Sequence, residues 1–217
     1  RLWQEALIDP EKAVFPDEIR NKNFYYANYL EEGLPGKTYF KAWDLGFKND
    51  AAAIVVVDVT TLPFKVVCLN LYEHVPYTSL QLIAGEYHRK FKGLDYVESN
   101  AMGEAFIQNL DFAAIGHFTG AKSKPEGLTR LQLLLEQGNI RYNPQIYPGD
   151  ILDDQLASYM WEDIKLVQDL VIALSIAAYY AYDRVAFALD VSDTDYQSPP
   201  KQMDAELDDN DLFLSEK

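Results

Sequence analysis

Three carboxylates stand at positions in the sequence from which they could bind a divalent metal ion together. Asp44 ends an apolar segment, Glu98 ends another, and Asp169 begins a long alanine-rich one. Clustered carboxylates repel one another and do not all stay ionised unaided, whereas Mg2+ prefers such oxygen ligands together with substrate phosphate. Two ions can activate an attacking water and stabilise a leaving oxygen. The pattern predicts a site for Mg2+ or Mn2+, with two ions expected, in which all three residues are ligands and catalytic groups.

Each carboxylate also has an ordinary structural interpretation. An aspartate at a strand end, such as Asp44, is common as a turn residue. Glu98 precedes a Ser-Asn loop and could be a solvated acid. Asp169 could simply favour the positive N-terminal end of its own helix. Only the joint placement of the three, on elements that meet in one fold, favours the metal site.

The elements that must position these residues follow from hydrophobic periodicity. We expect strands at 38–44, 51–58, 64–74, 94–98, 112–118 and 140–142, and helices at 78–91, 102–110, 126–137, 150–161 and 168–182. Three strands with short links come first, and helices and strands then alternate. This is the order of the α/β RNase H-like fold. That fold has a mixed sheet, with an antiparallel meander plus parallel strands, flanked by helices. Its first and fourth strands are central neighbours, which would place Asp44 beside Glu98.

The chain divides into three parts by composition. We expect a lead-in segment over residues 1–36, an RNase H-like domain over 37–187, and an acidic tail over 188–217 that is disordered when alone. From Ala186 to Lys217 nine acidic residues face only two lysines. Apolar residues punctuate these acids, which suits a segment that docks on a partner; the alternative is that the acids occupy the DNA groove and restrain cutting.

The net charge of −15 over 217 residues argues against a simple nucleic-acid binder. Phosphate contacts would have to come from metal ions or from a local basic cluster. The best candidate is the loop 119–124, through Lys122 and Lys124, although a plain solvated loop has equal weight. The three histidines have no metal-ligand spacing and are interpreted as structural, His117 with least assurance because it precedes that loop. The single cysteine, Cys68, fits strand packing.

The ordered motifs resemble the nuclease domain of the large terminase subunit of tailed bacteriophages. The segments that carry the resemblance are 39–46 with 50–55, 97–103, 118–124 and 168–177, within a match from about Tyr39 to Ala178. Two positions depart from the pattern. Glu98 replaces the more frequent aspartate, and Val167-Gln168-Asp169 stands where His-Asp-Asp is common. The second departure removes one potential ligand and puts tight binding of a second ion in doubt.

The resemblance implies an endonuclease that cuts double-stranded DNA with little sequence specificity during viral genome packaging. It also implies portal protein and the small terminase subunit as partners, and the host cytoplasm as the location. The ATPase domain of the same subunit is expected to be absent here, because Gly36-Lys37-Thr38 lacks the glycine a Walker A loop needs five residues earlier, where Glu31 stands. No signal peptide or membrane span is expected, since no apolar stretch approaches about 20 residues.

Two other functions remain open from the residues alone, and a third is excluded by length. The first is another RNase H-like nuclease of the junction resolvase or integrase type. The second is a non-catalytic RNase H-like module that docks a partner through its acidic tail. The third, an actin-like ATPase or sugar kinase, is suggested by Asp44-Leu45-Gly46 after a strand, but that fold needs a duplicated core that 217 residues cannot hold.

Overall fold

The structure is a computed structural model and describes residues 13–46, 51–100, 102–161 and 168–192. Its strands are β1 (Tyr39–Asp44), β2 (Ala52–Asp58), β3 (Phe64–Tyr72), β4 (Gly93–Glu98), β5 (Ile115–His117) and β6 (Ile140–Arg141). Its helices are α2 (Asp17–Asn21), α3 (Tyr77–Lys90), α4 (Met102–Gln108), α5 (Ser123–Glu136), α6 (Gly149–Ser158) and α7 (Asp169–Ser192).

One mixed sheet carries the fold, with the strand order β5-β4-β1-β2-β3-β6. β1, β2 and β3 form an antiparallel meander, whereas β4 runs parallel to β1 and β5 runs parallel to β4. The expected RNase H-like fold class is therefore confirmed. β1 is buried along its whole length because it has a neighbouring strand on each side and helices on both faces. β1 and β4 are thus neighbours, as the sequence predicts, and the two middle strands of the sheet are β1 and β2.

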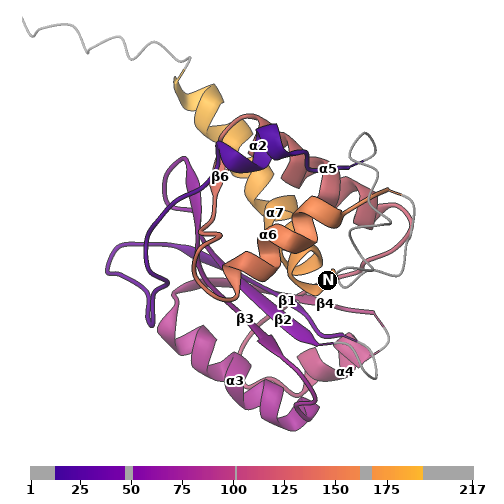
Figure 1. Cartoon of the computed structure of the whole chain (residues 1–217). Helices are drawn as coiled ribbons and strands as arrows, with labels where there is room; N and C mark the ends of the chain where they lie inside the picture. Colours follow the sequence, from indigo (N-terminus) through magenta and orange to yellow (C-terminus); the bar gives the residue numbers. More distant parts are fainter. Residues whose placement is uncertain (1–12, 47–50, 101, 162–167, 193–217) are drawn as a thin grey trace, which may run out of the picture.

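Helices cover both faces of the sheet. Figure 1 shows α5, α6 and α7 on one side and α3 and α4 on the other. Because side chains alternate along a strand, Phe40 and Ala42 join the core under α7, while Tyr39 and Trp43 join the core under α3. Asp44 continues the alternation of Phe40 and Ala42 and so belongs to the α7 face.

A buried ion pair lies across the β1–β4 pair on the α3 face. Lys41 and Asp95 are direct partners in the register, and Lys41 Nζ lies 3.3 Å from Asp95 Oδ2. Lys41 also donates to the Phe91 carbonyl at 2.6 Å, and His88 Nδ1 lies 2.7 Å from the same aspartate oxygen. A slip of either strand by one residue would turn its charge to the opposite face from its partner. We infer that this pair helps to fix the register that aligns the ends of the two strands.

Several elements differ in extent from those expected. β5 is reduced to three residues, and α5 begins at Ser123 because Pro125 is tolerated in a first helical turn. α7 continues to Ser192 rather than ending near Tyr182, since no glycine or proline interrupts that stretch. The first residues of the expected tail are thus helical, and 193–217 lie outside the described residues. Across the described ranges, no helix has the length and apolarity that crossing a membrane requires.

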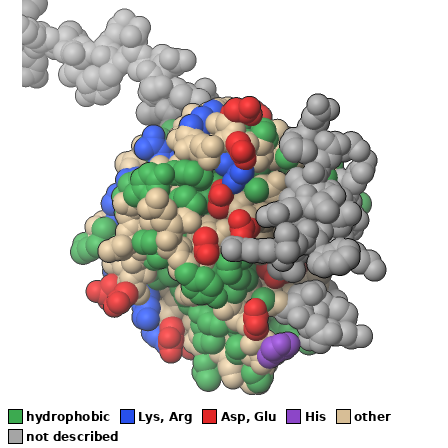
Figure 2. Space-filling model, viewed as in Figure 1, with side chains coloured by type: hydrophobic (Ala, Val, Ile, Leu, Met, Phe, Trp, Pro, Cys, Tyr) green, Lys and Arg blue, Asp and Glu red, His purple; other side chains and the backbone are tan. Residues whose placement is uncertain are grey.

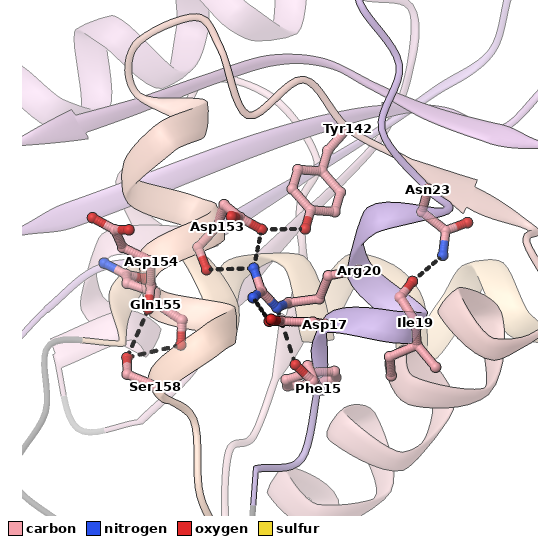
Figure 3. Close-up of polar contacts among 10 residues, drawn as sticks. All are labelled: Phe15, Asp17, Ile19, Arg20, Asn23, Tyr142, Asp153, Asp154, Gln155 and Ser158. Carbon is pink, nitrogen blue, oxygen red and sulfur yellow. Dashed lines mark hydrogen bonds and ion pairs between the residues drawn. The ribbon is translucent and has the colours of Figure 1, made fainter. Parts of the chain in front are cut away.

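Residues 13–24 of the expected lead-in pack on the α5–α7 layer. Val14 and Phe15 are buried in its core, and the Val14 N–H donates to the Tyr159 carbonyl at 3.0 Å. Figure 3 shows the Arg20 guanidinium enclosed by Asp17, Asp153 and the Phe15 carbonyl. These contacts join residues 13–24 to α6 and make them part of the folded unit.

Arg20 gives a test of that attachment. Arg20→Ala should lower the free energy of unfolding by about 1–3 kcal/mol, because it leaves partly buried acceptors without their cation. Chemical denaturation measures the change. Arg89→Ala, at an exposed position late in α3, is the matched control and should change stability by less than about 0.5 kcal/mol. Equal stability of the two variants would show that residues 13–24 are not anchored through Arg20.

Candidate active site

The ends of the neighbouring strands β1 and β4 bring two of the three expected acids together. β1 and β4 are aligned through the pair Trp43 and Val97, so Asp44 and Glu98 follow side by side as the last residue of each strand. Both share the face that α7 covers, since Tyr96, two residues before Glu98, stacks on Tyr180 of α7. The proximity expected from the sequence is present, and the roles of the residues stay a prediction.

The turn after β1 holds the Asp44 carboxylate in place. The Gly46 N–H donates to Asp44 Oδ1 at 3.2 Å, and Gly46 has a φ of +61°, which favours glycine. The Gly46 carbonyl in turn accepts from the Tyr77 hydroxyl at 3.1 Å. Burial, with the nearby charges of Asp44 and Glu98, raises the pKa of Tyr77. Tyr77, the first residue of α3, is a site neighbour that the sequence analysis missed.

The loop after β4 holds Glu98. Asn100 Nδ2 donates to Glu98 Oε1 and to the Thr119 carbonyl, each at 2.9 Å. Asn100 Oδ1 also accepts from the Thr119 N–H at 3.2 Å. A Cβ on Gly103 would lie only 1.8 Å from the Glu98 carbonyl oxygen, so α4 can approach the strand end this closely only with glycine there. Asn100 therefore links the orientation of Glu98 to the loop before α5.

The third acid begins α7. Gln155 Oε1 accepts from the N–H groups of Leu170 at 2.9 Å and Val171 at 3.2 Å, which fixes this end of the helix. Asp169 acts electrostatically on Asp44, but more weakly than Glu98 does. In the described part of the chain, no three acidic, histidine or cysteine side chains are grouped closely enough to hold a metal ion. The structure thus presents a close pair, Asp44 and Glu98, with Asp169 as a third charge that acts on Asp44 more weakly.

The electrostatics of the pair follow from burial and like charge. Asp44 is only 7% exposed. Burial, then the charge of Glu98 and a hydrogen bond to it, raise the pKa of Asp44 well above its usual range. The Gly46 N–H opposes this rise and Asp169 adds to it. Two adjacent carboxyl groups of this kind share a proton unless a cation neutralises them.

His117 lies beside the acids, on the neighbouring strand. It pairs with Glu98 in the β4–β5 register, and its Nδ1 lies 3.3 Å from the Tyr180 hydroxyl. Burial lowers the pKa of His117, although Glu98 and Glu126 act in the opposite direction. The ring also packs edge-on against Tyr179. These contacts agree with the structural interpretation of His117, and His88 is likewise engaged with Asp95.

The two candidate DNA-binding lysines lie at the start of α5. Lys122 is exposed and caps the helix, while the half-buried Lys124 belongs to its first turn rather than to a loop. Neither forms an ion pair with another described residue. On the face shown in Figure 2, acidic side chains are spread widely and Lys and Arg side chains gather toward one edge. A DNA backbone would therefore need local cations such as these two.

Comparison with known proteins places the fold. No family model matches the chain, and no curated protein matches its sequence. The large terminase nuclease from thermophilic phage G20c with bound magnesium has a TM-score of 0.65 and 17% identity over 77% of this chain and 96% of that one. The Thermus phage P74-26 large terminase nuclease domain has a TM-score of 0.59 and 16% identity over 76% and 93%. These neighbours confirm the suggested resemblance at the level of the fold.

A longer neighbour shows how much of a whole terminase this chain spans. A large terminase from another thermophilic bacteriophage has a TM-score of 0.58 and 14% identity. The similarity covers 78% of this chain but only 44% of that one. The G20c nuclease has also been solved with bound zinc and with bound cobalt.

The raised pKa of Asp44 predicts how stability depends on pH without divalent cations. A carboxyl whose pKa is higher in the folded state contributes stability below its unfolded pKa, and loses it as pH rises through the folded value. Asp44→Asn removes the buried charge, so at neutral pH in EDTA it should raise Tm by a few degrees. The difference should disappear in acid, and thermal melts across pH measure it. Asp111→Asn, an exposed control, should not reproduce it. A lower Tm for Asp44→Asn at neutral pH would contradict this account.

Proposed function

We propose that the chain is a divalent-metal-dependent endonuclease that cuts double-stranded DNA in a viral genome-packaging motor. The observation that carries the proposal is the Asp44–Glu98 pair, at the ends of adjacent strands and under the helix that Asp169 begins. The fold adds support, because its structural neighbours include terminase nucleases. A buried carboxyl such as Asp44 beside a half-buried one such as Glu98 is costly for folding unless the pair serves a ligand.

The donor set fits a hard divalent cation. Asp44 and Glu98 would supply carboxylate oxygens, and Asp169 would add a third negative group from the start of α7. Magnesium in a G20c structure, together with zinc and cobalt in others, supports a divalent ion without fixing which one or how many. We favour Mg2+ or Mn2+ and two ions. When bound, the metal supplies Lewis-acid stabilisation of the phosphodiester and lowers the pKa of a water.

The other residues of the site have supporting roles in this proposal. The Gly46 N–H holds the Asp44 carboxylate, and Asn100 orients Glu98. Lys122 and Lys124 hold the DNA backbone beside the acids, without contributing sequence information. No described helix presents a basic base-reading face, so cutting is expected with little sequence preference.

The partners follow from the same proposal. Double-stranded DNA is the substrate, and an ATPase domain of the same subunit would drive it. Portal protein and the small terminase subunit would complete the motor in the host cytoplasm. Docking through the acidic tail remains a proposal about residues 193–217, which the structure does not describe.

Two alternatives are kept for specific reasons. A resolvase or integrase-type nuclease would share the fold class and the paired strand-end acids. A non-catalytic docking module is favoured because, among the described residues, no three acidic, histidine or cysteine side chains are grouped to hold a metal ion. Incubation of supercoiled plasmid with Mn2+ separates the second from the proposal, because only a nuclease nicks and linearises the DNA.

Removing either paired charge should stop cutting. Asp44→Asn and Glu98→Gln should each slow plasmid nicking in Mn2+ by at least about 100-fold, because several kcal/mol of charge stabilisation is lost. Asp111→Asn controls for the loss of one exposed charge, and EDTA should stop the wild type. Cutting by Asp44→Asn at the wild-type rate would overturn the assignment of the site.

Replacing Lys122 and Lys124 together by alanine should weaken DNA binding. The slope of log affinity against log salt should become shallower by roughly 1–2, since fewer counterions are released. Fluorescence anisotropy over a salt series measures it. The matched control is Lys90→Ala with Lys92→Ala, two exposed lysines at the other end of the sheet. An unchanged slope would leave the start of α5 as ordinary surface.

A further inference from the structure

A pocket of about 320 Å³ lies at the start of α5. Leu128, Tyr159 and Met160 form its buried apolar lining, and Trp161, which is 51% exposed, stands at its rim. Its polar lining comes from Thr119, Lys124 and Gln168, with Gly120, Ala121 and Pro125 completing the wall. The pocket therefore combines an accessible aromatic ring with a cation and several hydrogen-bonding groups.

The pocket adjoins the candidate active site through two short connections. Thr119, which lines it, is hydrogen-bonded through both its N–H and its carbonyl to Asn100, and Asn100 also donates to Glu98. Gln168, which lines it too, directly precedes Asp169. A molecule in the pocket would thus lie next to whatever the acids act on.

The chemistry of the lining points to one class of ligand. Among the residues that the structure describes, no acidic side chain lines the pocket, although the chain carries a net charge of −15. Thr119 Oγ1 is buried and has no hydrogen-bond partner among the described residues, so a ligand with donor or acceptor edges would satisfy it. A flat, polar-edged ring stacks well on an exposed aromatic side chain, and an adjacent phosphate suits an ammonium group. A nucleotide has all of these features.

We propose that the pocket receives one nucleobase of the DNA strand to be cut, turned out of the duplex, with the base against Trp161 and its phosphate near Lys124. This inference rests on the proposed function, whose substrate it refines. Turning a base out of a duplex costs least where the DNA is already unpaired. The protein should therefore prefer duplex DNA that contains a short unpaired bubble. Because every base has a stacking face, the preference need not depend on sequence.

Binding in EDTA tests the proposal without cutting. The chain of 217 residues is titrated into a labelled duplex with a central bubble and into the fully paired duplex of the same length, and fluorescence anisotropy measures binding. The wild type should bind the bubble about tenfold more tightly, and Trp161→Ala should lose most of that preference. Trp161→Phe should retain much of it. Tyr26→Ala removes a similarly exposed aromatic side chain outside the pocket and should leave the preference intact.

A second substrate isolates the base itself. Replacing the unpaired nucleotides by abasic residues keeps the phosphates and removes the rings. This change should weaken wild-type binding about tenfold and hardly affect Trp161→Ala, because the two changes remove the same contact. A bubble preference that survives in Trp161→Ala, or no measurable preference in the wild type, overturns the inference.

The experiment separates this inference from the proposed function. If the chain cuts plasmid in Mn2+ but its DNA binding does not depend on Trp161, the nuclease proposal stands and the base-pocket inference is wrong. If the chain prefers bubble DNA through Trp161 but never cuts DNA, the base-pocket inference stands and the nuclease proposal is wrong. Circular dichroism of each variant confirms that it is folded.

Discussion

The adjacency of two carboxyl groups, Asp44 buried and Glu98 half-buried, is the constraint on which the rest of this structure depends. Asp44 and Glu98 end neighbouring strands in matched register, so the sheet itself sets their separation. Their mutual repulsion opposes folding at neutral pH. The surroundings nevertheless hold both in place, through the Gly46 N–H, the Asn100 amide and the close approach of Gly103. A local loss of folding free energy of this kind is expected at a ligand-binding site.

The same strand pair carries a second charged feature with the opposite character. Lys41 and Asp95 attract one another across β1 and β4 on the α3 face, whereas Asp44 and Glu98 repel on the α7 face. Alternation along the strands keeps the two sets apart. The attractive pair favours one register of the strands, and that register is the one that forces the acids together. We infer that a buried pair of this kind contributes specificity more than stability.

Much of this arrangement was predictable from the sequence, because it depends on local pattern. The continuous apolar run of β2 and the short strand that ends at Glu98 can be recognised in the sequence. Their order along the chain is that of the RNase H-like fold, in which the ends of β1 and β4 lie side by side. Lys41 was not recognised, since a lysine within an aromatic strand gives no local sign of its buried partner 54 positions away. The hydrogen bonds of Asn100 depend on a loop from another element, which no local pattern in the sequence indicates.

The central claim is that Asp44 and Glu98 bind a divalent cation together. Crystals of the chain soaked in Mn2+, with anomalous diffraction data collected, test it most directly. The account predicts an anomalous peak within coordination distance of both carboxylates, with Asp169 on the same side. The claim would be contradicted if the Asp44 and Glu98 carboxyls were ordered and close together in these crystals but no anomalous density lay beside them.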